Sequence, residues 1–328
     1  MTSREIVQRT LDFDNPERVA RSFGDSDFAG AGCRPKTHLT DWGEIGGGRW
    51  EMTDHWGNIW QRVDATSKGE VVRGVLEELS DMSSYEFPDY SRGEDYDAAR
   101  KAREENPDKW LTGWMPGFAF NIARKMRTLE QYMIDIITDR DRMRELHDRI
   151  DEVIEHMIRN YADAGVDAVT FPEDWGTQNA TLISPGLWYE EFFPRFEKLC
   201  GLAHGLGMRV FMHSCGRIGA IVPGMIEAGI DVFQFDQPDL HGIDNLAAYQ
   251  EKSKVTFWCP VDIQHVLPLR DEKIIRDKAR EMLDKLWRGR GGFIAGWYTD
   301  NESLNLESCW QEYACDEFVE HRPRSHQE

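Results

Sequence analysis

One segment pattern occurs twice in this chain, and it constrains the fold more than any other feature. Residues 164–171 (AGVDAVTF) are echoed by residues 228–235 (AGIDVFQF). In each copy a glycine that can end a helix precedes an apolar run typical of a buried strand. Before the first copy, from Met143 to Tyr161, apolar residues recur at steps of three and four among charged ones. This spacing predicts an amphipathic helix whose apolar stripe packs on a sheet.

The same alternation of strand and helix extends over the last two-thirds of the chain. Nearly continuous apolar strands that alternate with helices favour a parallel sheet covered on both faces. Two further units, around residues 19–23 and after Val71, would complete a (β/α)8 barrel. The predicted fold is therefore an α/β TIM barrel with an N-terminal elaboration, and an open doubly wound sheet is the alternative. The later strands are predicted at residues 110–115, 168–172, 209–213, 231–235, 255–259 and 292–297.

We expect a single domain over residues 1–328, because no low-complexity stretch or linker divides the chain. Residues 1–105 are assigned to an N-terminal elaboration that holds the first barrel units. It also contains a predicted hairpin, rich in Gly and Trp, at residues 42–63. Residues 106–318 carry the regular βα units, and residues 319–328 are expected to form a frayed tail.

Composition excludes two classes of partner. The chain has 59 acidic and 39 basic residues, giving a formal net charge of −20. A surface this acidic repels the phosphates of nucleic acids and anionic membranes. The N-terminus lacks the apolar core of a signal peptide, and no apolar run approaches the roughly 20 residues that span a bilayer. We expect a cytoplasmic protein in which most of the six cysteines stay reduced, and a homodimer is possible.

His213 and Cys215 are the strongest candidates for a metal site. They follow the apolar run 210–212 and are two residues apart, so on a strand their side chains point to one side. Their Cα atoms would be roughly 7 Å apart, close enough for an imidazole nitrogen and a thiolate to bind one Zn²⁺. The alternative is a buried histidine beside an inert thiol. Their position at a strand end favours the metal, because working residues of parallel α/β folds gather there.

Other strand ends carry residues that could complete such a site. Cys259 is a candidate second thiolate ligand, or else a small buried hydrophobe. Asp236 could bind the metal or orient His213, or it could cap a helix. The carboxylate pair Glu173 and Asp174 could serve proton transfer or could be ordinary loop acids. Glu173, Asp236 and Tyr298 are assigned as catalytic candidates, and the substrate-binding candidates are Trp114, Trp175, Gln178, Gln234 and Trp297.

Several of these segments together resemble a known family. Residues 213–216 (HSCG), 171–178 (FPEDWGTQ), 183–185 (ISP), 232–238 (VFQFDQP), 256–262 (TFWCPVD) and 291–294 (GGFI) look like the uroporphyrinogen decarboxylase superfamily. Within it they look most like the branch of corrinoid-dependent methyltransferases. The resemblance covers nearly the whole chain and implies a (β/α)8 barrel with its pocket at the C-terminal mouth.

Two departures limit what the resemblance implies about function. The arginine-rich stretch with which the decarboxylases hold substrate carboxylates corresponds here to residues 28–34, where only Arg34 remains. The methyltransferases add a third ligand, a cysteine near the end of the last strand, and Tyr298 stands in its place. Cys259, Asp236 or Glu173 would then complete the metal shell, or the metal is absent.

The resemblance therefore implies a zinc-dependent methyltransferase that moves a methyl group between a small substrate and a corrinoid (cobalamin) carried by a separate protein. Zn²⁺ in such a site activates a thiol or acts as a Lewis acid on an ether oxygen or amine nitrogen. A metal-free decarboxylase or lyase is the second enzyme hypothesis. A barrel that binds a small molecule without catalysis is the third.

Overall fold

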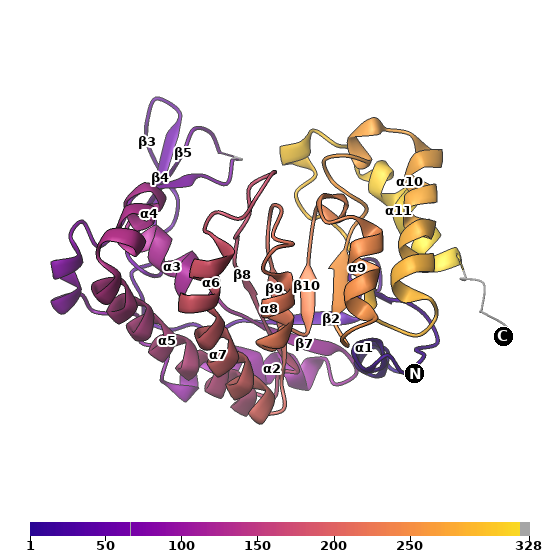
Figure 1. The fold of residues 1–328 in the computed structure, drawn as a ribbon, viewed down its shortest axis with the longest axis horizontal. Coiled ribbons are helices and arrows are strands. Elements are labelled where there is room, and N and C mark those ends of the chain that lie inside the picture. Colours follow the sequence, from indigo (N-terminus) through magenta and orange to yellow (C-terminus); the bar gives the residue numbers. More distant parts are fainter. Residues whose placement is uncertain (66, 322–328) are drawn as a thin grey trace.

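Eight parallel strands form a nearly closed barrel in the computed structural model, which describes residues 1–65 and 67–321 (Figure 1). The strands are β1 (Ala20–Arg21), β2 (Phe28–Ala31), β7 (Trp110–Trp114), β8 (Ala168–Pro172), β9 (Arg209–His213), β10 (Val232–Gln234), β11 (Thr256–Cys259) and β12 (Phe293–Ala295). Their order is β1-β12-β11-β10-β9-β8-β7-β2. The strands at the two ends of this order are consecutive in the chain, and the Asp27 amide donates a 3.0 Å hydrogen bond to the Arg21 carbonyl between them. The prediction of a TIM barrel is confirmed.

The strands predicted in the last two-thirds of the chain are all present, with ends that differ by at most two residues. The first early strand, β1, lies within the predicted residues 19–23. The second early strand was predicted wrongly: it is β2 at Phe28–Ala31 and not a segment after Val71. Val71 belongs instead to an antiparallel strand. A four-residue run with glycine and two alanines carries too little apolar pattern to mark a buried strand.

The tryptophan-rich segment forms a second sheet beside the barrel. Its antiparallel strands are β3 (Gly43–Gly46), β4 (Arg49–Thr53), β5 (Ile59–Arg62) and β6 (Glu70–Arg73). The predicted hairpin corresponds to β4 and β5, whose turn is held by Asp54. The Arg62 guanidinium stacks over Trp42 and Trp50, at 4.4 and 5.3 Å from their ring centroids. The sheet stands beside α3 and α4 at one side of the barrel (Figure 1).

Helices cover the outside of the barrel, as the amphipathic pattern predicts (Figure 1). The predicted helix at 143–161 is the core of α5, and the predicted Ser184 cap of α6 accepts a 3.2 Å hydrogen bond from the Leu187 amide. The last helix includes the first two residues assigned to the tail, whereas residues 322–328 lie outside the described residues. The helices are α1 (Ser3–Asp12), α2 (Asp97–Glu105), α3 (Ala119–Met126), α4 (Leu129–Thr138), α5 (Arg140–Asp163), α6 (Pro185–Glu191), α7 (Phe193–Gly205), α8 (Val222–Glu227), α9 (Ile243–Gln250), α10 (Glu272–Met282) and α11 (Ser308–Glu320).

The barrel interior is filled by side chains at its N-terminal end. Ile6, Val7 and Leu11 of α1 share one buried cluster with inward-facing strand residues, which include Phe211 and Ile294. Apolar strand residues of the opposite parity, such as Val210 and Phe257, belong to the outer core between barrel and helices. Because α1 packs against the N-terminal end of the barrel, the C-terminal mouth is the end where a ligand site is expected.

A buried ionic cluster joins α5 to α6 and α7. Glu191 lies between His147 Nδ1, at 2.9 Å, and Arg144 Nε, at 3.0 Å. Arg195 bridges Glu191 and Asp151 at 3.2 and 2.7 Å. Burial alone would raise the pKa of Glu191, but the hydrogen bonds from His147 and Arg144 lower it to about 2. The ionised Glu191 carboxylate thus holds α5, α6 and α7 together, and a protonated Glu191 could not pair with these cations.

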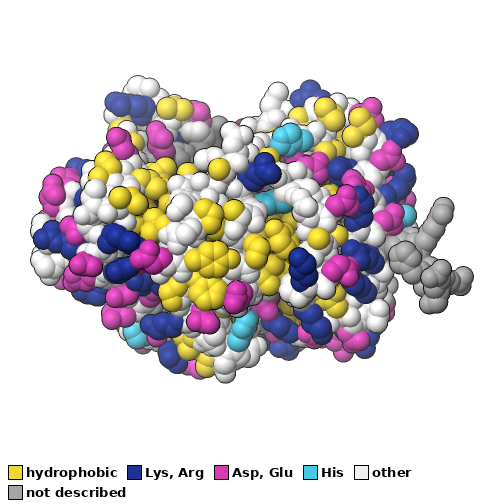
Figure 2. Space-filling view, viewed as in Figure 1, with side chains coloured by type: hydrophobic (Ala, Val, Ile, Leu, Met, Phe, Trp, Pro, Cys, Tyr) yellow, Lys and Arg dark blue, Asp and Glu magenta, His cyan; other side chains and the backbone are white. Residues whose placement is uncertain are grey.

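Charged side chains of both signs are interspersed over α10, and apolar side chains gather at the centre of the same face over α6 and α8 (Figure 2). The negative charge is therefore not collected into one acidic patch on this face. Among the described residues, no helix combines the length and the apolar character needed to cross a membrane.

Candidate metal centre at the barrel mouth

Three side chains that can bind a metal meet at the C-terminal ends of β8 and β9. They are Asp174, His213 and Cys215, and one ligand atom from each lies within 4.8 Å of the other two. His213 Nε2 is 3.3 Å from Cys215 Sγ and 3.5 Å from Asp174 Oδ1. Cys215 is exposed, whereas the other two are partly buried. The cluster is therefore open to solvent on its sulfur side.

Strand parity explains why these residues face the mouth. On β9, Phe211 points into the barrel, so His213 two residues later points the same way. On β8, Ala168 points inward, and Asp174 continues that parity beyond the strand end. Glu173 has the opposite parity and turns toward the helices. Because the inward-facing residues of β8 and β9 lie side by side, the Asp174 carboxylate and the His213 imidazole meet at the mouth.

The two loops that carry the ligands pack backbone against backbone. A Cβ on Gly216, whose φ is +77°, would lie 2.4 Å from the Gly176 carbonyl group. The Arg217 amide donates a 2.7 Å hydrogen bond to the Thr177 carbonyl, which locks the loops together. Glycine is required at 216 both for its left-handed conformation and for this close approach. The spacing of Asp174 from Cys215 is therefore fixed by the main chain.

Hydrogen bonds from β10 set the orientation of the His213 ring. His213 Nδ1 contacts Gln234 Oε1, and Gln234 Nε2 donates a 2.8 Å hydrogen bond to Asp236 Oδ1. Because the amide oxygen only accepts hydrogen bonds, the proton of a neutral ring resides on Nδ1. Nε2 then presents its lone pair toward Cys215 and Asp174. This is the arrangement of a histidine prepared to bind a metal.

Negative charge dominates the cluster. Burial alone would lower the pKa of His213, but Cys215, Asp236 and Asp174 raise it to about 10. Asp174 Oδ1 accepts a 2.9 Å hydrogen bond from the Cys215 amide, and its other oxygen lies 3.5 Å from Arg124. The same field that retains a proton on the imidazole would stabilise a cation placed between the three side chains.

The donor set and its spacing fit Zn²⁺. Bonds of about 2.3 Å to sulfur and about 2.0–2.1 Å to nitrogen or oxygen, in a tetrahedron, place ligand atoms roughly 3.4–3.6 Å apart. The separations from His213 Nε2 to Cys215 Sγ and Asp174 Oδ1, 3.3 and 3.5 Å, agree with this geometry. Three protein ligands would leave a fourth position for a substrate.

A cavity of about 370 Å³ adjoins the cluster on the inner side of His213. Lys68, from the segment between β5 and β6, reaches over it and lies 3.4 Å from the Tyr298 hydroxyl and 3.3 Å from Asp300. The four-stranded sheet thus contributes directly to the mouth of the barrel. The cavity is lined by Lys68, Thr170, His213, Gln234, Asp236, Trp258, Trp297, Tyr298, Thr299 and Asp300.

Three residues assigned from the sequence lie away from this cavity. Glu173 is fully buried and accepts hydrogen bonds from the Phe118 and Asn121 amides at the start of α3, while burial raises its pKa to about 8. Trp175 is also fully buried and stacks on Phe120 at 3.9 Å between centroids. Cys259 lies in the outer core, where burial raises the pKa of its thiol. The structure does not bring Cys259 into the metal cluster, because it faces the helices.

Of the remaining predicted residues, four line this cavity and two do not. Gln234, Asp236, Trp297 and Tyr298 line the cavity beside His213. Gln178 lies further out and donates a 3.3 Å hydrogen bond to Gln237. Trp114 ends β7 with 53% of its surface exposed and lines a separate cavity.

Sequence reasoning missed two contributors to the site. Asp174 was considered only as a partner of Glu173, although its parity with Ala168 would have identified it as the residue facing the mouth. No sequence pattern identified Lys68, because it lies outside the regular βα units, between β5 and β6.

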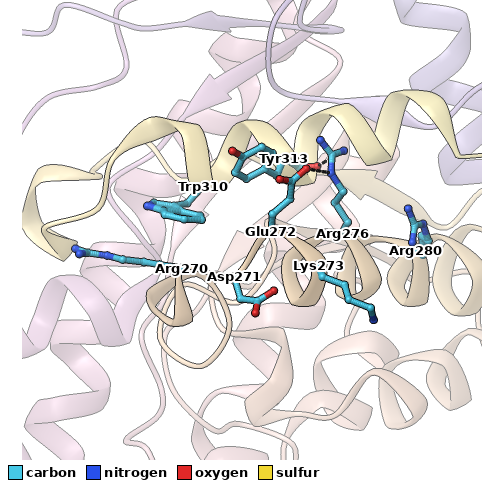
Figure 3. A pocket seen from close by; sticks show the side chains of 8 residues that line it. All are labelled: Arg270, Asp271, Glu272, Lys273, Arg276, Arg280, Trp310 and Tyr313. Atoms are coloured by element: carbon cyan, nitrogen blue, oxygen red, sulfur yellow. Dashed lines mark hydrogen bonds and ion pairs between the residues drawn. The ribbon is translucent and has the colours of Figure 1, made fainter.

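A larger groove of about 570 Å³ lies between α10 and α11, outside the barrel mouth (Figure 3). Its cations are already paired: Arg276 contacts Glu272 at 2.8 Å, and Arg280 contacts Glu317 at 2.7 Å. Figure 3 shows the side chains of Arg276 and Glu272 meeting beside Tyr313. Its charges are paired, and within residues 1–65 and 67–321 the one group of three metal-binding side chains is at the barrel mouth, so this groove is a weaker candidate for chemistry.

A family model described as Uroporphyrinogen decarboxylase (URO-D) matches residues 64–297, more than half of the chain. The chain belongs to the URO-D family. Its barrel is similar to a methyltransferase from Methanosarcina mazei, with 15% identity and a TM-score of 0.60 over 80% of this chain and 75% of the other. At this identity the likeness shows the fold alone.

Two other solved structures show weaker likeness to this URO-D family member. A B12-independent methionine synthase from Shewanella sp. W3-18-1 has 12% identity and a TM-score of 0.44 over 79% of this chain and 68% of that one. An endo-beta-1,4-xylanase from Gloeophyllum trabeum has 14% identity and a TM-score of 0.40 over 68% and 70%. A comparison with curated proteins gives no match.

Proposed function

We propose that this protein is a zinc-dependent methyltransferase that moves a methyl group between a small substrate and a corrinoid carried by a separate protein. The observation that carries the proposal is the cluster of Asp174, His213 and Cys215 beside an open cavity. Membership in the URO-D family and the barrel shared with a methyltransferase are consistent with it. Transfer to or from cobalamin, including O- or N-demethylation, is the reaction class that such a site would serve.

Each side chain of the cluster has a distinct part in this proposal. Asp174, His213 and Cys215 would hold the metal. Gln234 contacts Nδ1 of His213, so Nε2 is the nitrogen that would bind the metal after losing its proton. When bound, Zn²⁺ supplies Lewis acidity toward the oxygen, nitrogen or sulfur atom that carries the methyl group. One thiolate and one carboxylate leave the metal less negative than an all-thiolate shell, which favours this role over thiol activation.

Polar groups on the cavity wall would manage protons. Asp236 is held by Gln234 and faces the cavity, so it is placed to exchange a proton with the heteroatom as the methyl group is transferred. Tyr298 is held by Lys68 on the opposite wall. Glu173, buried under α3, has no access to the cavity, and we assign it no catalytic part.

The distribution of cations favours methyl transfer over decarboxylation of a multi-carboxylate substrate. Lys68 is the lysine that lines the mouth cavity, and Asp300 already pairs with it. Arg34 is exposed, and its amide bonds to the Asp95 carbonyl. Several substrate carboxylates would therefore face Asp236 and Asp300 without matching cations.

Metal analysis and cobalamin spectroscopy together test the proposal. Protein purified without chelators is expected to contain about one zinc per chain, to lose it in Cys215→Ser and to keep it in Cys259→Ser. Adding methyl ethers or methylamines to protein mixed with cob(I)alamin should then shift the cobalamin absorbance, and Cys215→Ser should abolish the shift. Zinc-free wild-type protein would favour the lyase or binding alternatives. Zinc retention in Cys215→Ser would refute the assigned ligands.

A further inference from the structure

A second cavity of about 300 Å³ lies between the four-stranded sheet and the rim of the barrel. The residues that line it are mostly apolar, and three of them are tryptophans. Trp56 is buried, Trp60 is partly exposed, and Trp114 exposes 53% of its surface. We call it the indole cavity, and its principal lining residues are Met52, Trp56, Trp60, Trp114, Ile122 and Lys125. A cavity at the lower end of the usual range of about 300–1,000 Å³ suits a ligand with one ring.

Lys125 brings a single unpaired charge to this apolar cavity. Its Nζ lies 5.5 Å from the Trp60 ring centroid. Within residues 1–65 and 67–321, no carboxylate forms an ion pair with it and no acceptor forms a hydrogen bond. Burial lowers the pKa of Lys125, as does the neighbouring Arg124, and the charges of Asp54, Glu173 and Asp174 offset this only in part. A desolvated ammonium without a counter-ion is costly, so an anion at this position would be bound favourably.

The acid that also lines the cavity does not fill this role. Asp54 accepts hydrogen bonds from the amides of Trp56 and Asn58, at 2.9 and 3.0 Å, and from Asn58 Nδ2, at 2.9 Å. Its second oxygen also accepts from Trp60 Nε1 at 2.7 Å. The carboxylate is thus engaged in closing the β4–β5 turn, and its charge is spread over four donors. Lys125 remains available to a ligand.

We propose that the indole cavity binds a small aromatic carboxylate. The ring would lie against the exposed faces of Trp60 and Trp114, and the carboxylate would pair with Lys125. An aromatic ammonium would meet like charge at Lys125, and a neutral ring would leave that charge unpaired. The inference does not depend on the metal cluster, because none of the three metal ligands lines this cavity.

Calorimetric titration with benzoate tests the inference on the full-length protein. Lys125→Met removes the charge and keeps the side-chain stem, and Lys68→Met makes the same exchange at the other cavity. Benzoate affinity is expected to fall about 10- to 100-fold in Lys125→Met, the loss typical of a charge-assisted hydrogen bond, and to stay unchanged in Lys68→Met. Thermal unfolding checks that each variant is folded. Trp114→Leu, at a largely exposed position, should also weaken binding.

Ligand chemistry and ligand position complete the test. Benzyltrimethylammonium and benzyl alcohol should bind at least about tenfold more weakly than benzoate. In crystals soaked with 4-bromobenzoate, the bromine should lie beside Trp60 and Trp114. Failure of benzoate to bind, preference for the ammonium, loss in Lys68→Met or a bromine at the barrel mouth would each overturn the inference. Retention of binding in Cys215→Ser separates this result from any failure of the proposed methyl transfer.

Discussion

Replacing Gln234 by leucine should weaken zinc binding without touching a ligand. The substitution keeps the size of the side chain but removes the oxygen that accepts from His213 Nδ1. The ring then loses the contact that fixes its orientation and its tautomer, while Asp174 and Cys215 keep their own contacts. Removing such a partner of a ligating histidine typically costs about 10- to 100-fold in metal affinity. We therefore expect a loss of about 1.4–2.7 kcal/mol in zinc binding.

Competition with a chromophoric chelator measures this change at fixed pH. Gln237→Leu is the matched control, because Gln237 lies nearby but contacts Gln178 rather than His213. Gln234→Glu restores an acceptor at the same position and should recover most of the affinity. If Gln234→Leu binds zinc as tightly as wild type, or if Gln237→Leu loses as much, then Gln234 does not position His213 and the reasoning fails.

Three further predictions concern stability and the geometry of the site. The folded pKa of Glu191 lies near 2, below its ordinary 4.5, so its stabilisation is present above pH 4.5 and is lost as pH falls toward 2. Urea unfolding near neutral pH should show wild type about 3 kcal/mol more stable than Glu191→Gln. This difference in unfolding free energy should shrink below pH 4.5, and a difference that is constant with pH would contradict the prediction. Trp175→Ala should cost about 3–5 kcal/mol of unfolding free energy but leave zinc stoichiometry unchanged, whereas a small cost would show that the ring is not core. Gly216→Ala should weaken zinc binding, because the added Cβ would clash with the backbone of Gly176. Gly219→Ala is the control, because no atom lies within 4 Å of its added Cβ. Chelator titrations that give the same zinc affinity for both variants would refute the close approach of the two loops.

Much of the barrel could be predicted from the sequence because its later strands are nearly continuous apolar runs. β8 and β9 begin and end where the sequence predicts, and the glycine-ended helices before β8 and β10 mark the repeating unit. β2 was not predicted, because Gly30 and its two alanine neighbours give no apolar pattern. Its place in the barrel is set by pairing with β7, a long-range contact that local propensity does not contain.

Strand parity explains which of the predicted site residues the structure brings together at the mouth and which it does not. His213 and Cys215 were identified because two ligands two residues apart on a strand face the same way. Glu173 was preferred to Asp174, although a shift of one residue reverses the direction of a side chain. Cys259 faces the outer core for the same reason, because its neighbour Trp258 is the β11 residue that lines the mouth.

X-ray absorption at the zinc edge of the metal-loaded protein tests the central claim most directly. The account predicts one sulfur at about 2.3 Å and the remaining nitrogen or oxygen ligands at about 2.0–2.1 Å, with the sulfur signal absent in Cys215→Ser. A shell with two sulfurs would require a second cysteine that the fold keeps away from His213. Such a result, or a shell without sulfur, would contradict a centre built from Asp174, His213 and Cys215.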